Sequence, residues 1–161
     1  MKSNLVYFNP TQGRITLDKV AEEIIKFIEE DINKRYHIII GSDSEGQGKI
    51  ELVNAIIVHR LGYGGRYFWR KVYREGINTL RQKIYEEVNL SISTTLEILK
   101  LFEEYKKTFI RSDVEVHVDI GAGGETKEMI KEIVGMVKGY GLEVKIKPEA
   151  YGATKVADRY L

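Results

Sequence analysis

The sequence predicts an α/β domain built on one mixed five-stranded sheet, with helices on both faces and an extra helix at the N-terminal end. Three observations support this. Helical periodicity and strand-like apolar runs alternate along the chain. Three strand-like runs follow one another with only short turns between them. Each later strand is followed by a helix, which favours parallel pairing. The 161 residues suffice for one core, and no repeat or linker divides them, so one domain over residues 1–161 is expected.

The N-terminal part is expected to hold an extended segment and a helix. Residues 5–14 are expected to be extended around a turn at residues 9–13, which contain Asn-Pro and a glycine. From residue 16 to residue 34 apolar side chains recur at helical spacing, and Thr16 is suited to cap that helix. The apolar positions are Leu17, Val20, Ile24, Ile25, Phe27, Ile28 and Ile32.

Three strands are expected next. A β-branched run at residues 36–40 ends in Gly41-Ser42-Asp43 and indicates a buried strand entering a turn. Residues 49–60 and 66–75 indicate a second and a third strand, joined by a glycine-rich turn. Such closely spaced strands form an antiparallel meander.

The second half of the chain alternates helix and strand. The expected elements are a helix at 79–107, a strand at 114–120, a helix at 125–139 ending at Gly139 or Gly141, a strand at 142–146 and a short helix at 154–161. Right-handed crossovers leave few topologies, of which the sheet order 3-2-1-4-5 is predicted. The first and fourth strands are then neighbours.

Composition excludes several kinds of chemistry. The chain has no cysteine, which excludes disulfides, thiolate zinc sites and a cysteine nucleophile. The net charge is only +1, so a nucleic-acid partner would need a local basic patch. No segment approaches the roughly 18 apolar residues of a membrane span, and the N-terminus lacks a signal-type apolar run. A cytoplasmic protein without a membrane partner is expected.

Two aspartates stand at the ends of predicted strands. Asp43 closes the first strand and Asp119 closes the fourth. If these strands are neighbours, both carboxylates emerge side by side, where open α/β sheets usually bind ligands. Carboxylates so close repel each other unless a proton or cation lies between them, and Mg²⁺ prefers such oxygen ligands. Either aspartate alone could equally begin a turn.

Two further carboxylates stand on predicted helices. Asp158 lies on the terminal helix beside apolar neighbours, although a lone helical aspartate is often only solvated. Glu87 shares a helix face with Ser91 and Thr94, at i+4 and i+7. A carboxylate on such a narrow face of small residues can approach a sheet closely. The adjacent Glu86 is the alternative, and a solvated glutamate is the commoner fate of either.

These four carboxylates occur in an order that resembles the RNase H-like superfamily. The sequence is more closely similar to an uncharacterised bacterial family within it, the YkuK-like proteins. The matching motifs are Ile40-Gly41-Ser42-Asp43-Ser44, His117-Val118-Asp119-Ile120-Gly121, Lys147-Pro148 and Val156-Ala157-Asp158. The resemblance spans nearly the whole chain. It implies Asp43, Asp119 and Asp158 as ligands of Mg²⁺ or Mn²⁺, with Glu87 as the best match for the helical carboxylate.

The third predicted strand alternates arginine with aromatic residues. One face must pack on the core, and the other then shows either an arginine row or an aromatic row, which could grip phosphates or stack on bases. Arg66 and Arg70, together with Ser44, are the candidate substrate contacts. A plain amphipathic strand with snorkelling side chains is the alternative.

Two other features suggest less. The glycine-rich segment 121–126 could hold a phosphate through its backbone N–H groups, but it lacks the Lys-Ser/Thr of a P-loop, and a plain turn is favoured. His37, His59 and His117 do not fall at paired ligand spacing. His117 is expected near the site as a strand residue, with a proton-shuttle role as the lesser option.

Two functional hypotheses follow. The first is a metal-dependent nuclease that hydrolyses RNA or DNA, with metal ions held by Asp43, Glu87, Asp119 and Asp158. The second is an RNase H-like module that binds nucleic acid or a protein without cleaving it. Converging carboxylates favour the enzyme, whereas carboxylates paired with lysine or arginine favour the binding module.

Overall fold

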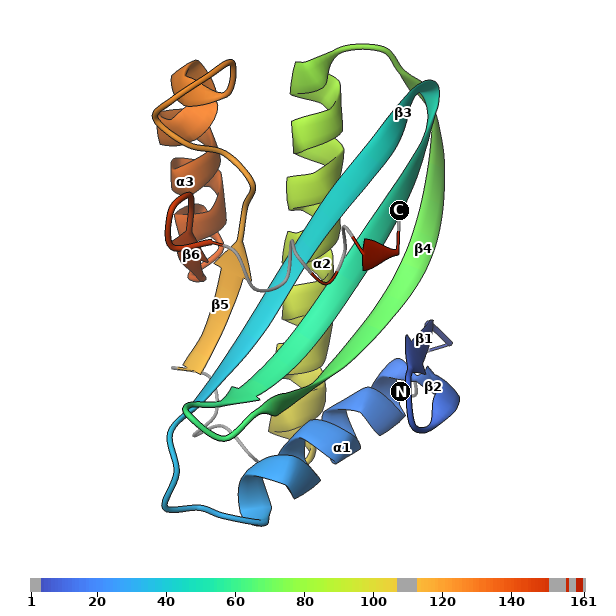
Figure 1. Ribbon diagram of the computed structural model, residues 1–161, viewed down its shortest axis with the longest axis vertical. Coiled ribbons are helices and arrows are strands. Elements are labelled where there is room, and N and C mark those ends of the chain that lie inside the picture. The colour runs from blue at the N-terminus through green and yellow to red at the C-terminus, as the bar shows by residue number, and fades with distance from the viewer. Residues whose placement is uncertain (1–3, 107–112, 151–155, 157–158, 161) are drawn as a thin grey trace.

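The computed structural model describes residues 4–106 and 113–150, together with residues 156, 159 and 160. Figure 1 shows a long twisted sheet with helices packed against it. The elements are β1 (Val6–Asn9), β2 (Gly13–Thr16), α1 (Leu17–Glu29), β3 (Tyr36–Arg60), β4 (Gly65–Ile77), α2 (Leu80–Glu104), β5 (Val114–His117), a 3₁₀ turn (Lys127–Met129), α3 (Ile130–Gly139) and β6 (Glu143–Lys145). No helix among these described residues is long and apolar enough to cross a membrane.

The helices begin where the sequence provides caps. The Thr16 side chain accepts a hydrogen bond from the Lys19 backbone N–H, as predicted for α1. Thr79 and Gln82 form a reciprocal capping box at the start of α2. The helix predicted at residues 125–139 is shorter than expected, because the 3₁₀ turn occupies its beginning.

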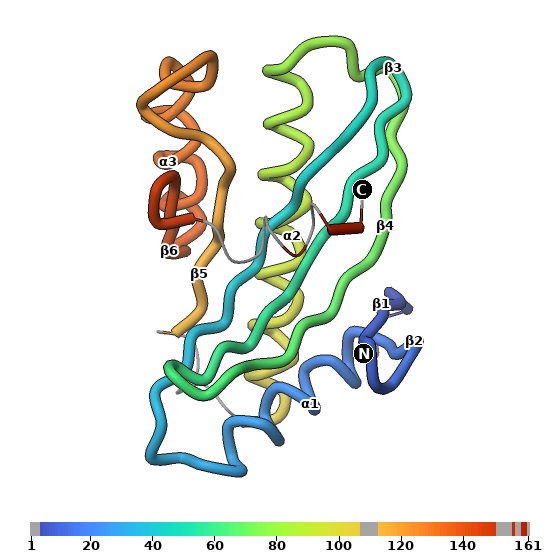
Figure 2. Tube along the Cα trace, viewed as in Figure 1, coloured from blue at the N-terminus to red at the C-terminus, as the bar shows by residue number. Residues whose placement is uncertain are grey.

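β3 contains two predicted strands in one continuous element. Its first arm pairs with β5 and its second arm pairs with β4. Figure 2 shows the chain running up the first arm and back down the second. Gly46 lies in the connection with a φ of +109°, and a Cβ there would stand 2.6 Å from the Lys49 carbonyl oxygen. Only glycine fits such a tight reversal.

The sheet order is β2-β1-β4-β3-β5-β6. The predicted order 3-2-1-4-5 corresponds to β4, the second arm of β3, the first arm of β3, β5 and β6. β3 is parallel to β5 and antiparallel to β4. The predicted total of five strands is wrong. Residues 6–9 and 13–16 form a hairpin that extends the β4 edge, so the sheet has seven strands when the arms of β3 are counted separately.

The two faces of the sheet are covered unequally. Side chains of α1, α2 and α3 share one large core with the sheet residues Ile38, Ile40 and Val116, and we call this side the helix face. On the opposite, outer face, Ile39, Val53 and Ala55 form a small cluster that Val156 and Tyr160 partly cover. The prediction of helices on both faces is therefore only partly confirmed. Within the described residues, three helices cover one face and this C-terminal segment lies on the other.

Candidate carboxylate site

The strand register brings Asp43 and Asp119 to the same level of the sheet. In the parallel pairing of β3 with β5, Ile38 aligns with Val114 and Gly41 with His117. Asp43 lies two residues beyond Gly41 and Asp119 two residues beyond His117. The prediction that Asp43 closes its strand is wrong, because β3 continues through it to Arg60, whereas Asp119 follows the end of β5. The prediction that the first and fourth strands are neighbours is nevertheless confirmed. The buried isoleucine run before Asp43 anchors the first arm of β3 in the core.

Glu87 reaches the same place from α2. Its side chain is only 6% exposed, although most helical glutamates remain in water. The Ser44 hydroxyl donates a hydrogen bond of 2.8 Å to Glu87 Oε1, which ties α2 to the strand just beyond Asp43. The neighbouring Glu86 is directed toward β4, where its carboxylate lies 3.6 Å from Arg74 Nε. Of the two glutamates, Glu87 is the one that faces the sheet.

Small polar residues hold α2 against the sheet, as their spacing with Glu87 predicts. Ser91 Oγ lies 2.8 Å from Ser42 Oγ, and Thr94 Oγ1 donates a hydrogen bond of 3.0 Å to Asn54 Oδ1. Asn54, which is fully buried, also donates to Ser42 Oγ and accepts a 2.6 Å hydrogen bond from the Tyr7 hydroxyl. Sequence reasoning missed this buried network, since it joins residues from three separate elements, β1, β3 and α2.

The charges of Asp43 and Asp119 act on the buried carboxyl group of Glu87. Burial, with a smaller contribution from the negative charges of Asp43 and Asp119, raises the pKa of Glu87 to about 8, although the Ser44 hydrogen bond opposes this shift. Without a cation, Glu87 is therefore largely protonated at neutral pH. We refer to Asp43, Glu87 and Asp119 as the carboxylate cluster.

Lys147 also belongs to the site, although the sequence analysis names it only as part of the Lys147-Pro148 motif. Its ammonium group lies 2.9 Å from Asp119 Oδ1. This contact and the nearby charge of Asp43 raise the pKa of Lys147. The register signals its position, because His117 aligns with Lys145 in the parallel pair of β5 and β6, and Lys147 follows two residues later.

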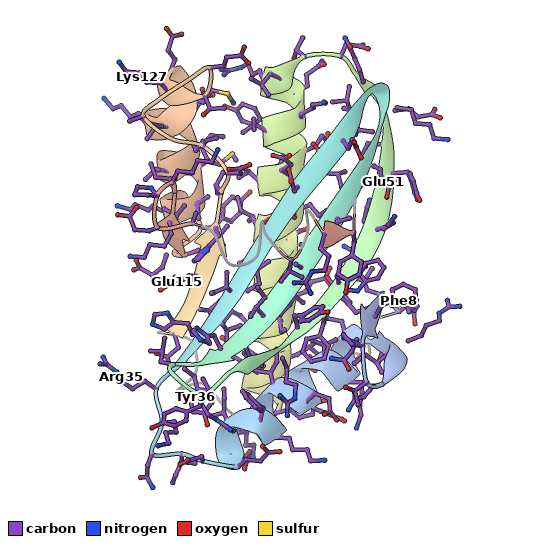
Figure 3. All side chains as sticks on the ribbon, in the orientation of Figure 1. Phe8, Arg35, Tyr36, Glu51, Glu115 and Lys127 are labelled. Atoms are coloured by element: carbon purple, nitrogen blue, oxygen red, sulfur yellow. The ribbon has the colours of Figure 1, made fainter. Side chains whose placement is uncertain are left out.

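The fourth predicted ligand, Asp158, lies outside the described residues. Its described neighbours Val156 and Tyr160 pack against the outer-face cluster. Tyr160 stacks on Trp69 with ring centroids 4.0 Å apart, and Figure 3 labels Phe8, which stacks on the same indole at 5.0 Å. Among the residues that the structure describes, no three Asp, Glu or His side chains lie close enough together to hold a metal ion as they stand.

Comparison with known proteins identifies the family. The family described as Ribonuclease H-like matches residues 19–161. The chain belongs to this ribonuclease H-like family. It is also 30% identical to the "Uncharacterized protein YkuK" of Bacillus subtilis (strain 168) over 173 residues, which cover 99% of each chain. No solved structure matches. The resemblance drawn from the sequence motifs is confirmed.

The predicted substrate contacts of this ribonuclease H-like chain already have partners within the fold. The Arg66 guanidinium lies over the Phe27 ring, with its central carbon 4.7 Å from the ring centroid. Arg70 Nε donates a hydrogen bond of 3.2 Å to the Tyr7 hydroxyl. Both arginines share the helix face with buried Phe68, so the aromatic row lies on the outer face. A role for Arg66, Arg70 or Ser44 in substrate binding stays a prediction.

The three histidines lie together on the outer face, which their sequence spacing does not indicate. His37, His59 and His117 all line a cavity of about 490 Å³ there. His117 Nε2 lies 2.9 Å from a carboxylate oxygen of Glu115, which Figure 3 labels beside β5. Burial lowers the pKa of His117, against the opposing effect of Glu115. His117 thus faces away from the helix face on which Glu87 approaches the strands.

The glycine-rich segment behaves as a turn. The Gly121 backbone N–H donates a hydrogen bond of 3.2 Å to Thr126 Oγ1 within the same segment. α3 begins only at Ile130. A backbone donor that a phosphate would need is already used, which supports the predicted turn.

Proposed function

We propose that this chain is a divalent-metal-dependent phosphodiesterase that cleaves nucleic acid, RNA or DNA, at the carboxylate cluster. The observation that carries the proposal is the placement of Glu87. A carboxyl group on α2 approaches two aspartates that lie just beyond the last paired residues of the parallel strands β3 and β5, and burial together with their charges raises its pKa. A packing role would not need a carboxyl group here. Perturbed carboxyl groups gathered from different elements are typical of catalytic sites.

The cluster fits Mg²⁺ or Mn²⁺ by its donor chemistry and its charge. All three side chains offer carboxylate oxygens, which these hard cations prefer. A divalent ion would offset the effect of burial and the repulsion from Asp43 and Asp119, which together raise the pKa of Glu87, and would favour its ionised form. Asp119 is now paired with Lys147, so we expect it to turn toward the ion on binding, with Asp158 as a further ligand.

The chain itself holds these ligands in position. A bound divalent ion would activate a water molecule and neutralise charge that builds up on the phosphate. The Ser44 hydroxyl orients Glu87, and the Ser44 backbone N–H fixes Asp43 through a hydrogen bond of 2.9 Å to Oδ1. Ligands anchored in this way lose little freedom when the ion binds, which favours a defined geometry.

The test is a cleavage assay on labelled single-stranded, duplex, hybrid and junction substrates with Mg²⁺ or Mn²⁺. Asp43→Asn and Glu87→Gln should each abolish cleavage while leaving the fold intact. Glu86→Gln is the matched control, because Glu86 carries the same side chain one residue away but contacts Arg74. Full activity in Asp43→Asn would refute the assignment of this site, as would a loss of activity in Glu86→Gln equal to that in Glu87→Gln.

The Asp119–Lys147 ion pair favours a second candidate, a nucleic-acid-binding module without catalysis. In that case the ammonium neutralises the cluster in place of a metal ion. Binding of an oligonucleotide would then be unaffected by chelators and by Asp43→Asn. Under the nuclease proposal, removing the metal weakens the binding of a phosphodiester at the site.

A further inference from the structure

The outer-face cavity lined by the three histidines has the size and the apolar surface of a small-molecule site. Its volume of about 490 Å³ lies within the range of pockets that bind small organic ligands. Ile39, Ile57 and Leu61 supply its apolar side chains. The Leu61 backbone N–H donates a hydrogen bond of 2.9 Å to the Arg35 carbonyl oxygen, which joins the two ends of β3 beside the cavity. The apolar wall is therefore held by the paired arms of one strand.

His117 brings an unpartnered nitrogen atom to this cavity. The residue is only 4% exposed, and its Nε2 lies 2.9 Å from Glu115 Oε2. Its Nδ1 is buried and has no hydrogen-bond partner among the residues that the structure describes. A carboxylate oxygen only accepts hydrogen bonds, so the neutral imidazole carries its proton on Nε2 and leaves Nδ1 as an acceptor. A buried acceptor without a partner is unfavourable, and a ligand that donates a hydrogen bond to Nδ1 would satisfy it.

Glu115 adds a second acceptor to the same cavity. Its Oε1 lies 3.8 Å from His37 Nδ1, which is beyond hydrogen-bond distance, so this oxygen can accept a hydrogen bond from a ligand. The described lining residues include two carboxylates, Glu115 and Glu149, and one ammonium group, that of Lys145. With neutral imidazoles the carboxylates outnumber the ammonium group, and this charge favours a cation over an anion.

We propose that the outer-face cavity binds a small organic cation through an amine or amidine group. The N–H bonds of that group donate to His117 Nδ1 and to the Glu115 carboxylate, and the apolar part of the ligand packs on Ile39 and Ile57. Hydrogen bonds between a charged N–H donor and a carboxylate are among the strongest that a protein forms. The site uses none of the carboxylate cluster and needs no metal ion, so it is separate from the proposed nuclease function.

The test compares benzamidine with benzoate by calorimetric titration of the full chain without metal. The two probes share a flat ring and a similar size, but the amidinium group donates hydrogen bonds and is positive, whereas the carboxylate group only accepts them and is negative. Benzamidine should bind, and benzoate should bind more weakly by about tenfold or more, which corresponds to about 1.4 kcal/mol.

Glu115→Gln should weaken benzamidine binding by about tenfold, because it removes the charge but keeps an oxygen that can accept from His117 Nε2. Glu143→Gln is the matched control. Glu143 is the residue of β6 that aligns with Glu115 in the parallel pair, but it does not line the cavity, so its substitution should leave the affinity unchanged.

A reading on the wild type needs no substitution. In a ¹⁵N-labelled chain the Nδ1 signal of His117 should shift when benzamidine is added and stay in place when benzoate is added. The inference is overturned if benzamidine does not bind, if benzoate binds equally well, or if bound benzamidine leaves the His117 signal unchanged. Equal loss of affinity in Glu115→Gln and Glu143→Gln would overturn it too. None of these results bears on the nuclease proposal, which the cleavage assay tests separately.

Discussion

Glu87 should destabilise the folded chain at neutral pH, and Glu87→Gln should remove that cost. The unfolded chain releases this proton near pH 4.5, whereas burial and the neighbouring aspartates hold it in the folded chain to about pH 8. The folded state therefore loses stability relative to the unfolded state as the pH rises through this window. At pH 7, which is 2.5 units above 4.5, the loss is on the order of 3 kcal/mol at about 1.4 kcal/mol per pH unit.

Glutamine keeps the shape and an oxygen that accepts the Ser44 hydrogen bond, but it does not ionise. In urea unfolding without metal, the variant and the wild type should have similar stability at pH 4. At pH 7 the variant should be more stable by up to about 3 kcal/mol. Taking the difference between the two proteins cancels the titration of the other groups.

Glu86→Gln is again the control, because Glu86 is half-exposed and its ion pair with Arg74 should contribute about 0–1 kcal/mol at any pH of this range. A stability difference between Glu87→Gln and the wild type that stays constant from pH 4 to pH 8 would refute the reasoning. So would a variant that becomes less stable than the wild type as the pH rises.

Four further outcomes are expected. Millimolar Mn²⁺ should raise the melting temperature of the wild type but not of Asp43→Asn, with a gain of about 2.7 kcal/mol at a hundredfold excess over Kd; equal shifts would point to another site. Asn54→Ala should cost about 3 kcal/mol or more in urea unfolding, because it leaves several fully buried partners unsatisfied, and a loss below about 1 kcal/mol would contradict this. Asp158→Asn should weaken Mn²⁺ binding in calorimetry without changing the metal-free melting temperature; unchanged affinity would remove Asp158 from the ligands. Arg70→Ala should weaken oligonucleotide binding and reduce its salt dependence by a slope of about 0.7–0.9, and an unchanged slope would mean that Arg70 meets no phosphate.

The arrangement of the strand ends could be predicted from the sequence because local signals determine it. The β-branched run before Asp43 and the strand before Asp119 have the period of buried strands, and short turns leave few ways to connect them. The spacing of Ser91 and Thr94 from Glu87 likewise predicts the face of α2 that approaches the sheet, which the structure confirms.

Other features depend on contacts between distant segments, which periodicity does not reveal. The sequence predicts an extended segment with a turn at residues 5–14, but residues 6–9 and 13–16 are too short to show a clear strand period, so their addition to the β4 edge does not follow from it. The sequence does not show which row of β4 side chains faces the core, because both rows are amphipathic. The packing of Phe68 into the core shows which row it is. The partners of Asn54 and Asp119 follow from the register of the strands and the packing of side chains, which the predicted sheet order alone leaves undetermined.

The costs of the site are themselves evidence about its purpose. A core formed for stability alone would place an apolar side chain where Glu87 lies, since burial of its charged form is unfavourable. The chain instead buries a carboxyl group beside two aspartates and surrounds its helix with hydrogen bonds to Ser44, Ser42 and Asn54. These bonds satisfy polar groups that the core would not otherwise contain. An arrangement that is expected to lower stability at neutral pH, and that a divalent cation would relieve, supports the proposed cation site rather than a packing role.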